Sequence, residues 1–128
     1  MKQSFDPQAG LILVPTEFHG PNGVTVLRLA LDTGATTTLV NLGPLLWLGY
    51  DPTLASEQVQ VTTGSGVESV ARIAVKKFTA LGRTRLNFPV LGHTLPPSVA
   101  VDGLLGLDFF SGAQLDIDFQ KGILHLRS

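Results

Sequence analysis

Short apolar runs, broken every few positions by glycine or proline, dominate the chain. Some runs alternate apolar with polar residues and others are apolar throughout, the patterns of half-buried and fully buried β-strands. Two apolar segments, 44–48 and 107–111, suit one or two helical turns each. The pattern predicts a mostly β, mainly antiparallel fold with one or two short helices. The expected strands cover residues 10–14, 24–31, 36–40, 58–63, 67–75, 86–91, 114–119 and 122–126.

Turn sequences indicate how these strands connect. Gly20-Pro21-Asn22-Gly23 ends in an Asn-Gly pair between two expected strands, so it predicts a hairpin. A longer hairpin has Gly64-Ser65-Gly66 at its tip, and a last one turns around Gln120-Lys121. The segments 32–34 and 101–106 each lead toward a short helix, which suggests a faint two-fold symmetry within the chain.

Composition limits the function classes. A chain of 128 residues with 44% hydrophobic and 15% charged residues is expected to form one domain over residues 1–128. The net charge of -1 gives no basic surface for nucleic acid. Without cysteine, the chain has no disulfide, thiol nucleophile or cysteine-bound metal. We expect no membrane partner and a cytoplasmic location, because no apolar segment of transmembrane or signal-peptide type is visible.

The segment Asp32-Thr33-Gly34-Ala35 places a carboxylate directly after an apolar strand. Taken alone, it is most simply a turn in which Asp32 bonds the backbone two residues on. His19, His93 and His125 are scattered and complete no zinc motif, so we expect no metal. Asp32 is therefore the candidate for chemistry, provided that the rest of the chain supplies a matching context.

That context is present, and the chain resembles the retropepsin-like aspartic proteases, single-domain relatives of pepsin with a bacterial branch. The resemblance rests on the loop 31–35, on the 59–75 hairpin where the family has its flap, and on Leu104-Leu105-Gly106 before a short helix. The closing segment 115–124 is similar to the bacterial branch. The resemblance implies a closed antiparallel barrel of the acid-protease type.

The resemblance also implies residue roles and partners. Asp32 would be the catalytic carboxyl, Thr33 would bond across a dimer axis, and Gly34 would place backbone close to the substrate. No cofactor or metal is implied, and the partners are a second copy of the chain and a peptide or protein substrate. The residues expected to bind substrate are Ala35, Leu104 and Leu105, with Gly64, Ser65 and Gly66 at the tip of the flap. For that tip the alternative is an ordinary exposed turn.

Two carboxyls can hydrolyse a peptide bond without metal or thiol. Held about 3 Å apart they share one proton, so the ionised group activates water while the protonated group donates to the carbonyl oxygen. The chain has one Asp-Thr-Gly, so the resemblance implies an endopeptidase formed by a homodimer with one Asp32 from each subunit. The alternative is an inactive pepsin-like domain used for dimerisation or peptide binding.

The chain departs from the retroviral pattern at two points. Retroviral enzymes commonly have an acidic residue and an arginine that pair near the dimer contact, where this chain has Thr36 and Leu107. It also continues beyond the second short helix, through residues 114–126. The dimer contact is therefore expected to differ in detail. Asp108 is expected to cap or brace the 107–111 turn rather than to act in catalysis.

Overall fold

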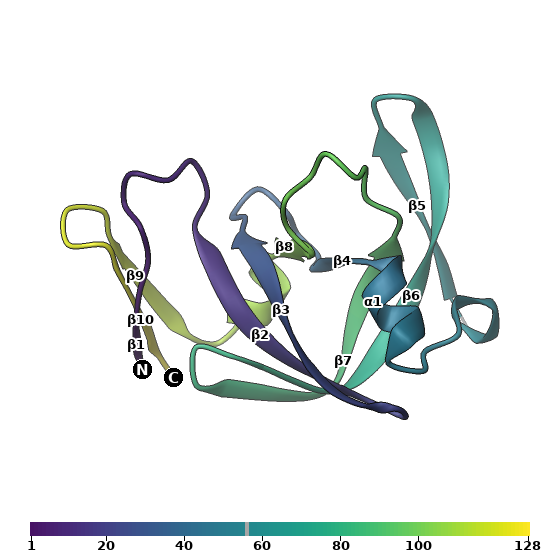
Figure 1. The fold of residues 1–128 in the computed structure, drawn as a ribbon, viewed down its shortest axis with the longest axis horizontal. Coiled ribbons are helices and arrows are strands. Elements are labelled where there is room, and N and C mark those ends of the chain that lie inside the picture. The colour runs from purple at the N-terminus through teal and green to yellow at the C-terminus, as the bar shows by residue number, and fades with distance from the viewer. Residues whose placement is uncertain (56) are drawn as a thin grey trace.

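The computed structural model of the protein describes residues 1–55 and 57–128 and consists mainly of strands and turns (Figure 1). The two α-helices lie at the two apolar segments predicted to be helical, and among the described helices none is long and apolar enough to cross a membrane. The elements are β1 (Lys2–Ser4), β2 (Leu13–Gly20), β3 (Gly23–Leu31), β4 (Leu39–Asn41), α1 (Leu42–Trp47), the 3-10 turn η1 (Pro52–Leu54), β5 (Glu57–Thr63), β6 (Gly66–Ala80), β7 (Arg83–His93), β8 (Gly103–Leu105), α2 (Leu107–Phe110), β9 (Gln114–Asp118) and β10 (Ile123–Arg127).

Six of the described strands close into a barrel. Their order is β2-β3-β8-β4-β7-β6, and β6 pairs back onto β2, with Phe18 opposite Phe78. Most neighbours are antiparallel, whereas β3 with β8 and β4 with β7 are parallel. The predicted closed and mostly antiparallel barrel is confirmed. The two parallel contacts join strands far apart in the chain, so no local pattern indicates them.

Aromatic side chains fill the barrel. The ring centroid of Phe78 lies 4.9 Å from that of Phe18, 4.7 Å from that of Phe88 and 5.4 Å from that of Phe109. Phe109 comes from α2, so the short helix inserts an aromatic ring into the core. Removing a buried phenylalanine typically costs about 3–5 kcal/mol, which makes this cluster a main source of stability.

The long strand β6 serves both the barrel and a protruding hairpin. Residues near its end pair with β2 and β7, whereas Gly66–Arg72 pairs with β5 (Glu57–Thr63). The turn between the two strands is Gly64-Ser65, and Gly66 has a φ of +127°, which favours glycine. Figure 1 shows this hairpin, at upper right, extending away from the barrel.

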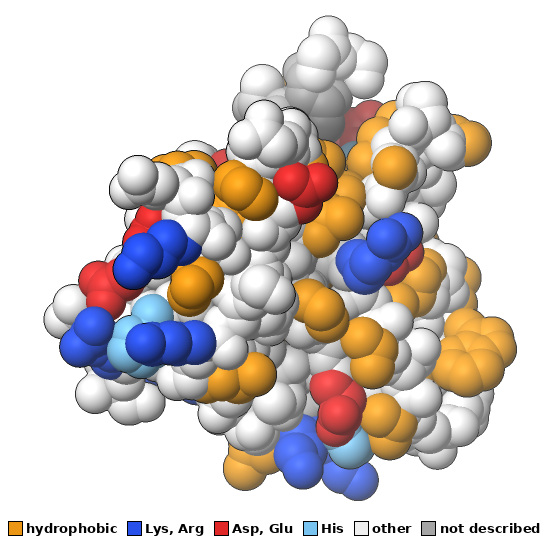
Figure 2. Space-filling model, turned by 60° about the vertical axis from the view of Figure 1, so that its left-hand side comes forward, with side chains coloured by type: hydrophobic (Ala, Val, Ile, Leu, Met, Phe, Trp, Pro, Cys, Tyr) orange, Lys and Arg blue, Asp and Glu red, His pale blue; other side chains and the backbone are white. Residues whose placement is uncertain are grey.

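A second sheet contains both ends of the chain, in the order β1-β10-β9. Leu124 and Leu126 of β10 are buried on its inner side. On its outer side His125 pairs with Lys2 across the strands, and Figure 2 shows basic and histidine side chains gathered at the left of this view. Burial and the positive charges of Arg127, the N-terminus and Lys2 lower the pKa of His125. Asp116 lies opposite His125 and pairs with Arg127, so this sheet has one apolar face and one solvated face of mixed charge.

Some predicted element boundaries are wrong. The strand expected over 10–14 begins only at Leu13, since Gly10 and Leu11 are exposed and lie outside the barrel. The strand expected over 36–40 covers Leu39–Asn41, because the backbone before it bonds to a distant loop. β7 continues to His93, where a loop was expected, because β4 pairs with its last residues. The short strand β1 has no apolar pattern of its own.

A substitution at Gly103 tests how closely β8 packs against β4 in the barrel. An added Cβ would lie 2.2 Å from the backbone oxygen of Leu39, so Gly103→Ala should lower the free energy of unfolding by about 3 kcal/mol or more. A Cβ at Gly10 would have nothing within 4 Å, so Gly10→Ala should stay within about 0.5 kcal/mol of the parent. Urea denaturation measures both. Equal stabilities of the two variants would contradict the close approach of β8 to β4.

Candidate active site

The loop after β3 is anchored on both sides. The N–H of Leu31 donates to the oxygen of Ile12 at 2.9 Å, and the N–H of Asp32 donates to the oxygen of Leu105 at 3.0 Å. β3 lies between β2 and β8, so Asp32 leaves the barrel from the middle of the sheet. Its side chain is half-buried. The strand ends therefore determine the direction in which this carboxyl leaves the barrel.

Inside the loop, Asp32 also makes the bonds of a turn. Its Oδ1 accepts from the N–H of Gly34 at 2.8 Å, and its backbone oxygen accepts from the N–H of Ala35 at 3.2 Å. A Cβ on Gly34 would lie 3.2 Å from the same Oδ1, which is a tight contact. The bonds that make this segment a simple turn are thus the same bonds that orient the Asp32 carboxylate. Gly34 lets the backbone pass close to the Asp32 carboxylate.

A second loop, after β8, crosses the first. The N–H of Leu107 donates to the oxygen of Ala35 at 2.9 Å, and the N–H of Gly106 donates to Oγ1 of Thr38 at 3.1 Å. A Cβ on Gly106 would come within 2.8 Å of the Ala35 oxygen. Only a glycine fits between the two loops, which explains the Leu-Leu-Gly motif in physical terms.

Asp108 connects the two loops through a fully buried threonine. The Thr38 hydroxyl donates to Oδ1 of Asp108 at 2.7 Å, and the Thr38 N–H lies 3.0 Å from Oδ2 of the same carboxylate. Asp108 therefore braces the helical turn, as expected, but it does not supply the side-chain cap of α2, which begins after Gly106 without one. Its partner 70 positions away was not anticipated from the sequence.

Asp102 has a comparable structural role at the base of the second loop. Its Oδ2 accepts from the N–H of Arg28 at 2.9 Å, and its own N–H donates to the oxygen of Arg28 at 2.9 Å. Its backbone oxygen accepts from the N–H of Asn41 at 2.7 Å. This aspartate therefore holds the base of the second loop to β3 and β4.

The structure places the other predicted site residues unequally. Thr33 and Gly34 are exposed beside Asp32, and Ala35 is half-buried between the loops. Figure 1 shows this loop, the 94–102 loop and the tip of the β5–β6 hairpin, with Gly64, Ser65 and Gly66, along the same edge of the molecule. The turn residues and the Asp32 loop therefore bound one region of the surface.

The role expected for Leu105 in substrate binding is wrong for its side chain. That side chain is 0% exposed and packs in the core, and Leu105 contributes to the site only through its backbone oxygen. Leu104 is half-buried, opposite Ala30 and Leu39. The sequence alone does not show whether an apolar residue in a strand belongs to the core or to a pocket wall. Successive side chains of β8 point to opposite faces, so Leu105 enters the core and Leu104 does not.

A model of the aspartyl protease family matches residues 14–109, which includes both loops and the hairpin. The chain belongs to the aspartyl protease family. No curated protein sequence matches it. In solved structures, a retropepsin-like aspartic protease from Rickettsia conorii has a similar fold, with a TM-score of 0.70 and 19% identity over 99% of this chain and 91% of that one.

The retroviral protease-like domain of Ddi1 from Leishmania major is also similar, with a TM-score of 0.59 and 21% identity. The match covers 93% of this chain and 90% of that domain. At identities this low, the two structural matches establish a shared fold and nothing more. The resemblance of the sequence to retropepsin-like aspartic proteases is confirmed.

A substitution at Thr38 tests how this member of the aspartyl protease family holds its two loops together. Thr38→Val removes the hydroxyl that accepts from Gly106 and donates to Asp108, leaving buried groups without partners. We expect a loss of about 1–3 kcal/mol in the free energy of unfolding. Thr62→Val, at an exposed position of β5, should change it by less than about 0.5 kcal/mol. Matching denaturation curves would mean that the crossing does not stabilise the fold.

Proposed function

We propose that the protein is an aspartic endopeptidase that acts as a homodimer and cleaves extended peptides. The observation that carries the proposal is the Asp32 loop, anchored to Ile12 and Leu105 and supported from below by the crossing second loop. The family match and the flap-like hairpin beside this loop support it. We take residues 1–128 as a single domain that supplies half of the site.

In the proposed reaction, two Asp32 carboxyls meet on a two-fold axis and share one proton. The ionised carboxyl removes a proton from a bridging water, whose oxygen attacks the peptide carbonyl carbon. The protonated carboxyl donates its proton to the carbonyl oxygen. The resulting tetrahedral intermediate collapses as the carboxyl that took the water proton gives it to the amide nitrogen and the carbon–nitrogen bond breaks. The other carboxyl takes back a proton from a hydroxyl of the intermediate, so the pair again shares one proton. The Gly34 to Asp32 bond keeps each carboxylate in one orientation throughout.

The surface around Asp32 supports a second copy as partner. Thr33 and Gly34 are exposed, and Leu107, whose backbone bonds to Ala35, is 46% exposed. An apolar side chain exposed beside the catalytic loop gains by burial against an equivalent surface. Leu107 and Thr36 occupy positions of the retroviral ion pair, so this contact would be apolar rather than ionic.

The terminal sheet favours a dimer without interleaved ends. β10 already pairs with β1 on one side and with β9 on the other, both within the same chain. A partner strand therefore has no free edge of β10 to enter. We infer that two preformed chains dock, in contrast to dimers in which terminal strands alternate.

Apolar side chains beside the site favour apolar residues in the substrate. Leu11, in the loop before β2, is 52% exposed, Val99 in the 94–102 loop is 41% exposed, and Val67 near the hairpin tip is 66% exposed. Leu104, in β8, is half-buried. We propose that these side chains flank the scissile bond while the hairpin closes over the peptide and excludes water.

Asp32→Asn tests the chemistry. The neutral amide cannot act as the base, so cleavage of an unstructured protein between about pH 4 and 7 should fall about 10³-fold or more. Asp118→Asn, at the end of β9, is the control and should keep parental activity. Initial rates of peptide release measure both. Equal activity of Asp32→Asn and the parent would remove Asp32 from the mechanism, and inactivity of a folded, dimeric parent would favour the peptide-binding alternative.

Mixing and dilution test the shared site. With a homodimer, an excess of Asp32→Asn chains should inhibit the parent, since mixed dimers lack one carboxyl. Leu107→Glu places a charge in the proposed contact and should shift the chain toward monomer with at least about tenfold lower activity. Val24→Glu, on a residue 51% exposed at the far end of β3, should do neither. Sedimentation measures the mass. A monomeric parent with full activity would contradict the dimer.

A further inference from the structure

Two ring nitrogens of His93 face two oxygen acceptors. Nδ1 lies 2.9 Å from the backbone oxygen of Thr94, and Nε2 lies 2.6 Å from Oε2 of Glu68. Carbonyl and carboxylate oxygens only accept hydrogen bonds. Both contacts are hydrogen bonds at the same time only when both nitrogens carry a proton, which is the imidazolium form of histidine. The placement of the two acceptors thus favours a positively charged ring.

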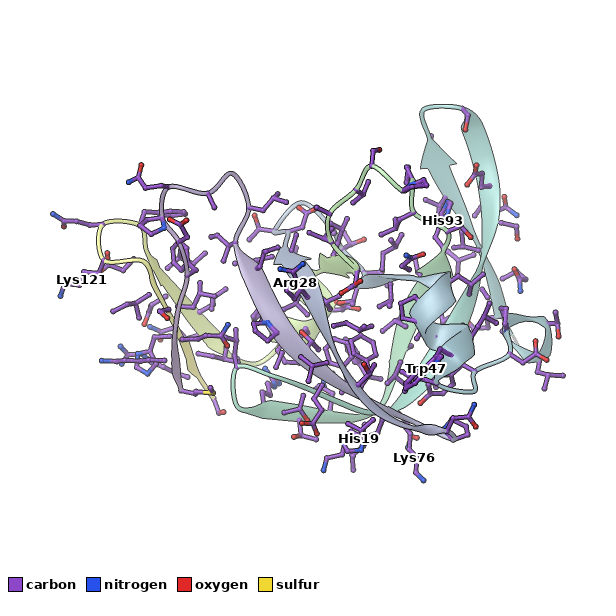
Figure 3. All side chains as sticks on the ribbon, in the orientation of Figure 1. His19, Arg28, Trp47, Lys76, His93 and Lys121 are labelled. Carbon is purple, nitrogen blue, oxygen red and sulfur yellow. The ribbon has the colours of Figure 1, made fainter. Side chains whose placement is uncertain are left out.

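The contact between His93 and Glu68 joins two elements beside the proposed substrate site. Glu68 lies in the hairpin formed by β5 and β6, opposite Val61. His93 ends β7, where the 94–102 loop begins. Figure 3 shows His93 beside the stem of the hairpin. The contact therefore joins the proposed flap to the adjoining loop, and its side chains are only 25% and 42% exposed.

The surroundings leave Glu68 as the charged group that faces His93 in the described part of the chain. A hollow of 390 Å³ beside the pair is lined on the flap by Gln58 and Ser69, on η1 by Thr53 and on α1 by Leu42, which are uncharged, and β4 places Asn41 opposite His93. Three charged groups on or next to these elements have contacts of their own. Arg72 pairs with Glu57 at 3.1 Å, and Asp51 accepts from Thr53, which lowers the pKa of Asp51.

We propose that the Glu68–His93 pair is a pH-dependent latch that positions the flap against the wall of the substrate site. When His93 carries both protons, both contacts hold. When it loses one, the neutral ring has a donor for only one of the two acceptors. With the remaining proton on Nδ1 the Glu68 carboxylate loses its donor, and with that proton on Nε2 the bond to Glu68 is no longer between two charged groups, so the contact that holds the flap stem is lost or weakened in either case. Histidine side chains change charge between about pH 5 and 8, so the flap is held in acid and loosened toward neutral pH. What the flap covers rests on the proposed function, while the latch is a property of the fold.

The chain contains a matched control in a second His–Glu pair. His19 Nε2 lies 2.5 Å from Oε1 of Glu17 on the same strand, β2. Within the described residues the other ring nitrogen of His19 has no acceptor, so a neutral ring protonated on Nε2 satisfies the contact. Figure 3 shows His19 at the opposite end of the barrel from the flap. This pair connects no two elements.

The latch is tested by amide hydrogen exchange of β5 and β6 in the Asp32→Asn chain, which prevents self-cleavage. After correction for intrinsic exchange, flap protection should be about five- to tenfold higher near pH 5.5 than near pH 8. Glu68→Gln can both donate and accept, so it bonds His93 in either form and protection should no longer depend on pH. Glu68→Ala should show low protection at both values, and Glu17→Gln should follow the parent.

Two outcomes would overturn the latch. One is a pH dependence in Glu68→Gln equal to that of the parent, and the other is an equal loss of pH dependence in Glu17→Gln. In the chain with Asp32 intact, Glu68→Gln should also extend the alkaline limb of the kcat/KM profile, whereas Glu17→Gln should not. A chain that shows the expected exchange but no cleavage would retain the latch and refute the proposed peptidase activity.

Discussion

The candidate site depends on two loops, the one after β3 and the one after β8, which cross so closely that only glycine fits at position 106. Buried N–H groups at Thr38 and Gly106 need acceptors, and the Thr38 hydroxyl and the Asp108 carboxylate supply them. Leaving one such group unpaired costs about 1–3 kcal/mol, a large fraction of the stability of a small domain. The Asp32 backbone is bonded to the same crossing through Leu105. Stability of the fold and orientation of the carboxyl thus come from one arrangement.

How far the sequence predicts this structure depends on the range of the interactions. Alternating apolar positions and Gly-rich turns predict the barrel strands and the flap-like hairpin, since those signals are local. The Asp-Thr-Gly-Ala motif predicts the loop. Thr38 and Asp108, 70 positions apart, carry no local signal of their pairing. Strand β1 is equally hidden, because Lys2–Ser4 becomes a strand only where β10 offers an edge.

The two His–Glu pairs show that residue type alone does not determine behaviour. Both place a carboxylate within hydrogen-bond distance of Nε2, and both are visible in the sequence as common surface residues. The two pairs differ in the backbone oxygen of Thr94, which lies within hydrogen-bond distance of Nδ1, the second ring nitrogen of His93. A single additional acceptor distinguishes the two pairs, and only the folded chain reveals it.

The pairing of β10 on both edges has a consequence for how activity would be governed. A chain that pairs both edges of β10 by itself can complete folding alone, so in the proposed homodimer the assembly of the site would be a separate, bimolecular event. The catalytic capacity of that dimer would rise with the square of chain concentration while the dimer is sparse. A higher rate of synthesis or a higher local concentration in one compartment would raise the dimer population and the activity. Dilution would lower both without unfolding or degrading the chain.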